Sequence, residues 1–169
     1  MNRGFNLLEL TVVVALLSAL LTIARPSFNG FFERIKMKRL ASELNGFMAQ
    51  AKSEAVLRNQ RLYAHFSFSA NPVSHTDTWH ITLTDQIVAG GEPLFFLDGS
   101  AFRGLAIRHS YNLGYISFDS TRGRPTSGSI AFFPQQTPSM VLKVVMANPP
   151  GRVRLCGLNG TLYGYAACE

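Results

Sequence analysis

The feature that most constrains this 169-residue sequence is an apolar run of twenty residues, Phe5 to Ala24, which begins almost at the N-terminus. As a helix the run is about 30 Å long, because each residue adds about 1.5 Å, and this length matches the hydrocarbon core of a bilayer. It contains one carboxylate, Glu9. An acid at the centre of a membrane helix costs about 2.5–3.5 kcal/mol. The sequence therefore predicts a membrane-entering helix and a functional role for Glu9.

The flanks of the run differ from those of a cleavable secretory signal. No small-residue A-x-A site follows it, and the small residue Gly4 precedes it instead. The pattern Arg3-Gly4-Phe5-x-x-x-Glu9 resembles the class III signal of type IV pilins and type II secretion pseudopilins. This resemblance implies cleavage after Gly4 by a prepilin peptidase, N-methylation of Phe5, and pairing of Glu9 with the terminal amine of a neighbouring subunit. An ordinary signal anchor with an incidental glutamate is the alternative.

A second helical pattern follows the apolar run and continues to residue 61. Apolar residues recur at intervals of three and four, and charged residues fill the other faces, which is typical of an amphipathic helix. The apolar stripe comprises Phe28, Phe32, Ile35, Leu40, Leu44, Phe47, Ala51 and Ala55. We expect the two segments to form one long helix whose second half packs on the rest of the chain.

After residue 61 the apolar period changes to two, which indicates strands. Strands are expected at 62–68, 79–83, 93–97, 105–109, 115–119, 129–133, 140–146, 152–155 and 161–165, separated by Gly, Pro, Asn and Asp turns. Many short strands joined by tight turns favour antiparallel pairing. With the resemblance, the sequence predicts an α+β type IV pilin fold: a leader (1–4), a transmembrane and assembly helix (5–27), and a head (28–169). In the head, helix 28–61 packs on an antiparallel β-sheet region, 62–169.

The head is basic and contains two cysteines. The formal net charge of the chain is +6, with twelve arginines and four lysines. Guanidinium groups suit phosphate and carboxylate recognition, although a basic surface that only aids solubility is the alternative. Cys156 and Cys168 can form a disulfide if the head lies outside the cytoplasm, and this would stabilise it by about 3 kcal/mol. Two free thiols remain the alternative.

No arrangement of residues indicates an enzyme, a metal site or a cofactor. The histidines lack the spacing of metal ligands. The sequence also lacks a nucleophile elbow, a Walker loop and a dinucleotide-binding fingerprint. We therefore expect a binding or structural protein that uses neither metal nor cofactor.

Two arginines near the C-terminus form the strongest candidate site. Arg152 and Arg154 follow a turn that ends in Gly151. On a strand they would point to one face about 6–7 Å apart, close to the spacing of successive phosphates along a nucleic-acid strand. Each guanidinium could then clamp one phosphate. Other basic residues that can widen the site are Arg103, Arg108, Arg122, Arg124 and Lys143.

The segment Gly151-Arg152-Val153-Arg154, followed by two cysteines, is similar to the GRxR motif of FimT-like minor pilins in the GspH/FimT family. The resemblance implies DNA binding by a pilus during natural transformation. The motif places Gly151, Arg152 and Arg154 in the DNA-binding site, and we expect the basic residues Lys143 and Arg103 to extend it. Because no base-reading module is visible, binding should ignore base sequence and use the phosphate backbone.

The resemblance also implies partners and a location. The partners are other pilins of the filament, DNA, the inner membrane and a prepilin peptidase. The protein would cross the bacterial inner membrane once before assembly and would then lie in a pilus, in the periplasm or at the cell surface. The main alternative is a structural minor pseudopilin that primes filament assembly in type II secretion or pilus biogenesis. Adhesion to a polyanion through the same basic surface is a third hypothesis.

Overall fold

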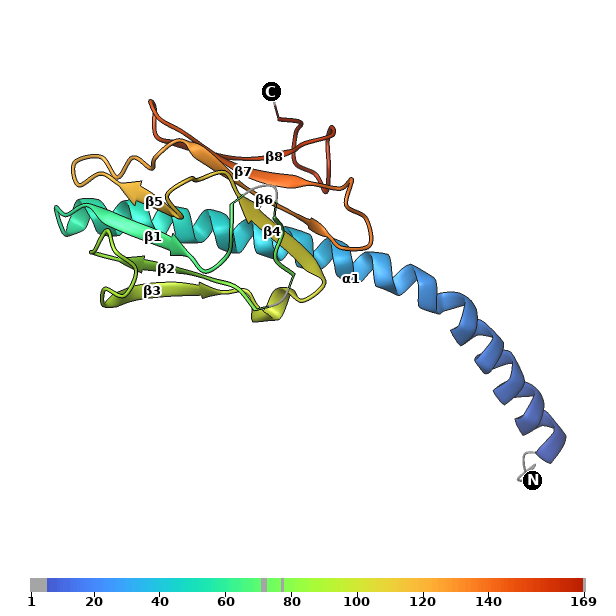
Figure 1. Ribbon diagram of the computed structural model, residues 1–169. Coiled ribbons are helices and arrows are strands. Elements are labelled where there is room, and N and C mark those ends of the chain that lie inside the picture. Colours follow the sequence, from blue (N-terminus) through green and yellow to red (C-terminus); the bar gives the residue numbers. More distant parts are fainter. Residues whose placement is uncertain (1–5, 71–72, 77, 169) are drawn as a thin grey trace. The chain divides into compact units, whose positions relative to one another are not determined.

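A computed structural model describes residues 6–70, 73–76 and 78–168, without the side chains of residues 22–29. Helix α1 (Leu7–Leu57) comes first and all strands follow it (Figure 1). The strands are β1 (Leu62–Phe66), β2 (His80–Thr84), β3 (Pro93–Asp98), β4 (Leu105–His109), β5 (Tyr115–Phe118), β6 (Gly128–Pro134), β7 (Leu142–Ala147) and β8 (Arg152–Gly157). A short 3₁₀ helix, η1 (Ser100–Phe102), lies between β3 and β4.

The chain divides into two units between Ile35 and Lys36. In the first unit Glu9 lies in the first turn of α1 and is exposed. Within the part of the chain that the structure describes, no helical segment is both long and apolar enough to cross a bilayer. The predicted leader (1–4), with its cleavage residue Gly4, and Phe5 lie outside the described residues. The side chains of residues 22–29, in the predicted segment 5–27, lie outside them as well.

The second half of α1 packs on antiparallel sheet, as the amphipathic pattern predicted. Leu40, Leu44, Phe47, Ala51 and Ala55 are buried. Among the residues of α1 whose side chains are described, the first buried one is Met37, in the second unit. The predicted start of the stripe and of the head, residue 28, lies among the side chains that are not described. Two residues of the expected stripe, at positions 32 and 35, belong to the first unit and are exposed.

Helix α1 ends at Leu57, four residues before the predicted boundary at 61. Asn59 adopts a left-handed backbone conformation with φ 49°. Its N–H donates to the carbonyl of Val56, and the N–H of Gln60 donates to the carbonyl of Ala55. These two bonds form a Schellman cap, which stops a helix while satisfying its last carbonyls.

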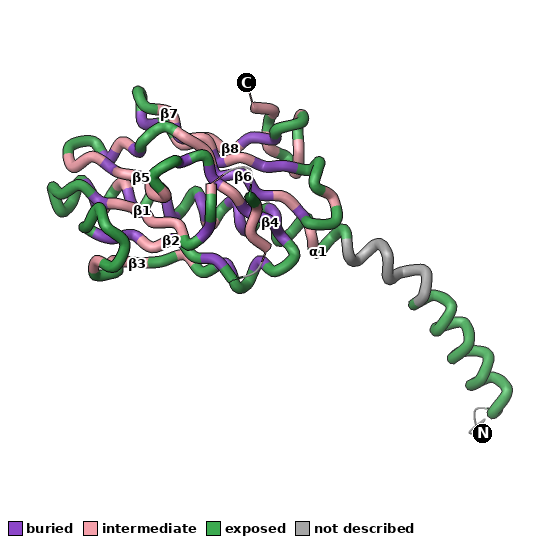
Figure 2. The backbone as a smooth tube through the Cα atoms, in the orientation of Figure 1, coloured by how far each residue is buried: buried purple, intermediate pink, exposed green. Residues whose placement is uncertain are grey.

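The described strands form two antiparallel sheets rather than one continuous region. Their strand orders are β3-β2-β1-β5 and β4-β6-β7-β8. Figure 1 shows both sheets beside the C-terminal half of α1. Buried side chains from this half of α1 and from both sheets form one hydrophobic cluster, and Figure 2 shows the buried segments gathered inside the head.

The predicted strand 161–165 is wrong, because this segment forms a tight turn. Tyr163 and Gly164 have positive φ angles of 53° and 94°. Leu162 and Tyr165 exchange two backbone hydrogen bonds of 3.0 and 2.8 Å across them. Two successive positive φ angles reverse the chain as in a type I′ turn, so no strand can continue through this point.

Candidate functional site

The two arginines of the Gly-Arg-x-Arg segment lie on β8, at the edge of the second sheet. Arg152 pairs with Ala147 of β7, and Arg154 pairs with Val145. The alternate β7 residues Leu142, Val144 and Met146 are buried, so both arginines point away from the core. The structure therefore places Arg152 and Arg154 on one outward face, two residues apart, as the alternation predicted.

A cation on β7 shares this face. Lys143 stands opposite Cys156 in the β7–β8 ladder and is half-buried. Lys143 is two residues from Val145, which pairs with Arg154, so Lys143 and Arg154 are diagonal neighbours across the two strands. Such neighbours lie within about 8 Å of each other. The structure thus brings Lys143, Arg152 and Arg154 together. A hollow of about 190 Å³ lies along this face, lined by Val145, Ala147, Arg152, Arg154 and Cys156.

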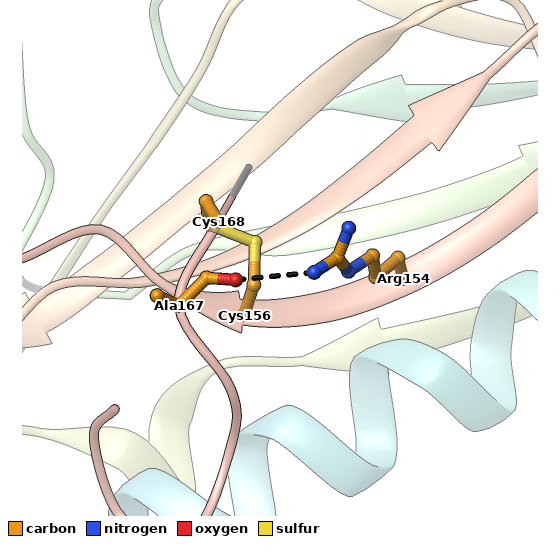
Figure 3. The surroundings of a disulfide bond; sticks show 4 residues. All are labelled: Arg154, Cys156, Ala167 and Cys168. Atoms are coloured by element: carbon orange, nitrogen blue, oxygen red, sulfur yellow. Dashed lines mark hydrogen bonds between the residues drawn. A yellow bond between two sulfur atoms is a disulfide. The ribbon is translucent and has the colours of Figure 1, made fainter. Parts of the chain in front are cut away.

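The C-terminal tail holds Arg154 in place. Cys156 and Cys168 form a disulfide, with their Cα atoms 5.0 Å apart. Next to it, Nη2 of Arg154 donates a 3.1 Å hydrogen bond to the carbonyl of Ala167, as Figure 3 shows. The tail also pairs with Gly157, whose N–H donates to the carbonyl of Ala166. The Arg154 guanidinium is consequently oriented by the tail, while Arg152 is exposed.

Gly151 has a backbone role in this site. Its φ of 81° lies in the left-handed region, and a Cβ built on it would lie 2.9 Å from Cγ of Arg124. Its carbonyl accepts a 3.0 Å hydrogen bond from Nζ of Lys52 on α1. A side chain here would be strained and would displace Arg124, so glycine is needed to start β8 at this point.

Arg103 lies away from the other predicted residues. It follows η1, and its carbonyl accepts a 3.1 Å hydrogen bond from Nζ of Lys36. Arg103 lies two residues before Leu105, which pairs with Pro134 at one end of β6. Arg152 lies near the other end of β6, because its neighbour Val153 pairs with Met146 of β7, which pairs with Gly128. Pro134 lies six residues from Gly128 along β6. This separation corresponds to about 20 Å along the sheet. The structure therefore does not bring Arg103 together with Arg152 and Arg154.

Arg108 occupies the same outward face at a greater distance. It pairs with Ala131 of β6, and Ala131 pairs with Lys143 of β7. Two strand spacings separate Arg108 from Lys143, which is about 10 Å. The guanidinium carbon of Arg108 lies 5.4 Å from the centre of the Phe133 ring, so part of this side chain is held against an aromatic face.

The charge pattern of the C-terminal part of the chain explains the basic surface. From residue 120 to residue 168 the sequence contains no aspartate or glutamate, but it contains Arg122, Arg124, Lys143, Arg152 and Arg154. Two basic residues near this surface were not predicted from the sequence. Lys52 donates a hydrogen bond to the carbonyl of Gly151, and Arg61 lines a hollow with Arg122 and Arg124. The acid-free stretch was a sequence signal for the basic surface, but neither Lys52 nor Arg61 lies within it.

The described residues contain no group of three or more His, Cys, Asp or Glu side chains placed to hold a metal ion. His109 is buried and stacks on Phe66 with ring centres 4.2 Å apart. Its Nδ1 accepts the N–H of Tyr111, and its Nε2 lies 2.9 Å from the carbonyl of Phe68. A ring that accepts at Nδ1 and donates at Nε2 is neutral, so His109 is a structural residue that joins neighbouring strands.

Comparisons with known proteins agree with this fold. A family model described as type II transport protein GspH matches residues 40–164. The crystal structure of the type IV minor pilin FimU from Pseudomonas aeruginosa (strain PAO1) is 22% identical, and the alignment covers 74% of this chain and 91% of the FimU chain, with a TM-score of 0.53. A second crystal form of FimU is 20% identical over 70% of this chain and 90% of the FimU chain, with a TM-score of 0.47. No curated protein matches the sequence.

Proposed function

Because this chain belongs to the GspH family of type II transport proteins, we propose that it is a DNA-binding minor pilin. Family membership makes it a structural, pilin-like subunit of a type IV pilus or a type II secretion filament, which interacts with other pilins. The proposal adds that it assembles in, or at the tip of, a type IV pilus and binds extracellular DNA for uptake in natural transformation. This role corresponds to that of FimT-like members of the family.

One observation carries the proposal. The β7–β8 register gathers Lys143, Arg152 and Arg154 on one outward face of an edge strand, and none of the strands of that sheet contains an acid. Three cations at every second position of the β7–β8 ladder suit the repeating phosphates of a DNA backbone. Each neutralised phosphate contributes about −0.9 to the log–log salt slope for duplex DNA, so these three residues predict a slope of about −3.

The test is a DNA-binding titration of the full-length protein in a nonionic detergent at several salt concentrations. The variant Arg152→Gln/Arg154→Gln should bind a labelled duplex about tenfold or more weakly, with a slope less steep by about 2. The matched control is Arg34→Gln/Arg39→Gln, which removes the same charge from two exposed residues of α1. Binding by the arginine variant at the strength of this control would remove β8 from the mechanism.

The second candidate function is a structural minor pseudopilin that primes filament assembly. The match of the family model to a type II transport protein favours it. In this case the protein would show no salt-dependent affinity for DNA, and deletion of its gene would impair secretion or piliation without a separate defect in DNA uptake.

For assembly we propose that a prepilin peptidase cleaves after Gly4, and that mature Phe5 is N-methylated. Before assembly the segment 5–27 then crosses the inner membrane, and afterwards the subunit lies in the pilus or the periplasm. Glu9 pairs with the terminal amine of a neighbour, because a carboxylate in an apolar filament core needs a cation.

Glu9→Val should leave the protein in the membrane fraction but strongly reduce its recovery in sheared filaments. Glu9→Asp, which keeps the charge, is the control. Equal filament recovery for Glu9→Val and the unchanged protein would show that charge pairing is not required. Mass spectrometry of the mature N-terminus tests the cleavage site independently.

A further inference from the structure

A second group of arginines lies beside the β8 motif. A hollow of about 280 Å³ is lined by Arg61, Arg122 and Arg124 together with Asp119, Ser120 and Thr121. Arg61 lies between α1 and β1, whereas the other residues lie in the connection from β5 to β6. Arg61 and Arg122 are exposed, and Arg124 is half-buried. Side chains that are distant in the sequence therefore converge on one basic hollow.

The single carboxylate of this hollow is used to build the turn. Asp119 accepts hydrogen bonds from the backbone N–H groups of Thr121, Arg122 and Arg124, at 3.0, 2.6 and 3.0 Å. These bonds, chiefly the one from Arg122, lower the pKa of Asp119. Among the described residues, neither Arg61 nor Arg122 forms an ion pair. Their guanidinium groups therefore face solvent and can accept an external anion.

Contacts with α1 place the turn that precedes β8 and the turn that contains Arg122 and Arg124 side by side. Gly123, with φ 61°, approaches α1 so closely that a Cβ on it would lie 2.5 Å from the carbonyl oxygen of Lys52. The same lysine donates through Nζ to the carbonyl of Gly151. Gly151 in turn packs on the side chain of Arg124. Lys52 of α1 thus contacts both turns. Arg124 also contacts Gly151, the residue directly before Arg152.

We propose that the β8 arginines and this hollow form one continuous track for a DNA backbone. A strand of phosphates held by Arg154 and Arg152 continues across Gly151 to Arg124, and then to Arg122 and Arg61. The inference rests on the proposed DNA-binding function and extends its site. A series of cations that runs from β8 to an adjacent turn suits a chain of phosphates better than a single free anion, because each cation meets its own phosphate.

The test compares Arg61→Gln/Arg122→Gln with the Arg34→Gln/Arg39→Gln control, in full-length protein and nonionic detergent. Both residues are exposed, so the fold should be retained, and circular dichroism with thermal unfolding checks this. The variant should bind duplex DNA about tenfold more weakly, and its log–log salt slope should fall by about 1.8, which is 0.9 for each of two lost phosphate contacts. Arg61→Lys/Arg122→Lys should restore most of the slope, because the charges return.

The outcomes separate the two proposals. If Arg61→Gln/Arg122→Gln matches the control in affinity and slope while Arg152→Gln/Arg154→Gln does not, the extended track is wrong and the β8 site stands. If the unchanged protein shows no affinity for DNA, both proposals fail. Heparin binding is measured in the same way. If Arg61→Gln/Arg122→Gln loses affinity for heparin but keeps its affinity for DNA, the hollow binds a different polyanion and the track is again overturned.

Discussion

At the scale of single residues, Lys52 of α1 contacts both turns next to the basic surface, although it is not a proposed DNA contact. Its backbone carbonyl lies against Gly123, and its ammonium group bonds to the carbonyl of Gly151. Both glycines have positive φ angles, so each of these turns can adopt its path at low cost. The spacing of the arginines therefore depends on close backbone packing in addition to the arginines themselves.

Gly123→Ala tests this packing. The added Cβ meets the Lys52 carbonyl, so we expect the free energy of unfolding to fall by about 1–2 kcal/mol from strain at positive φ, and further from the clash. Gly114→Ala is the matched control, because Gly114 has a similar φ of 71° but nothing within 4 Å of its Cβ position. Chemical denaturation measures both. Equal losses for the two variants would show that contact with α1 does not constrain the turn.

At the scale of elements, β8 is completed by the tail that follows it. Cys168 is joined to Cys156, and its N–H donates a 2.9 Å hydrogen bond to the carbonyl of Gly157. This pairing covers the end of an edge strand and brings the carbonyl of Ala167 to Arg154. The disulfide is therefore part of the site, since it keeps the partner of one arginine in position.

Cys156→Ser/Cys168→Ser should lower the free energy of unfolding by about 3 kcal/mol in the chain-entropy picture. The amides of Gly157 and Cys168 should exchange with solvent faster, because the tail is no longer held. DNA affinity should fall less than in Arg152→Gln/Arg154→Gln, because both arginines remain. Unchanged amide protection at these two positions would show that backbone pairing alone retains the tail.

At the scale of the whole molecule, His109 connects the two sheets. It belongs to β4, yet it stacks on Phe66 of β1 in the other sheet. Burial lowers its pKa below the ordinary value of 6.5, and the charge of His75 acts in the same direction, while the hydrogen bonds to Phe68 and Tyr111 oppose them. The fold thus favours the neutral ring.

The unfolded chain then binds a proton at His109 more readily than the folded chain does. The contribution of His109 to stability is complete above pH 6.5 and is lost as the pH falls from there through the lower pKa of the folded state. We expect the free energy of unfolding to decrease between pH 7 and pH 5. In His109→Gln this dependence should be smaller than in the control His80→Gln. Equal dependence in the two variants would contradict the assignment.

Local patterns in the sequence predicted most of the elements. The change of period near residue 61 separated helix from strand, and β4 was predicted at its observed bounds. Periodicity succeeds in such cases because it reflects which face of each element is buried. It failed at 161–165, where the positive φ of Tyr163 turns the chain, and at the end of α1, where Asn59 forms the cap. These conformations depend on single residues that a periodic pattern does not distinguish.

The sequence by itself determined the α+β class, the position of Arg152 and Arg154 on the same face of one strand, and the acid-free basic stretch. Each of these features depends on residues that are close together along the chain. Tertiary structure alone decided which distant cations share a surface. The tertiary structure places Lys143 beside the β8 arginines and Arg103 about 20 Å away from them. It also brings the turns that contain Gly123 and Gly151 into contact with Lys52. Strand register and the approach of turns to a helix are set by packing across the core, and no local pattern encodes those distances.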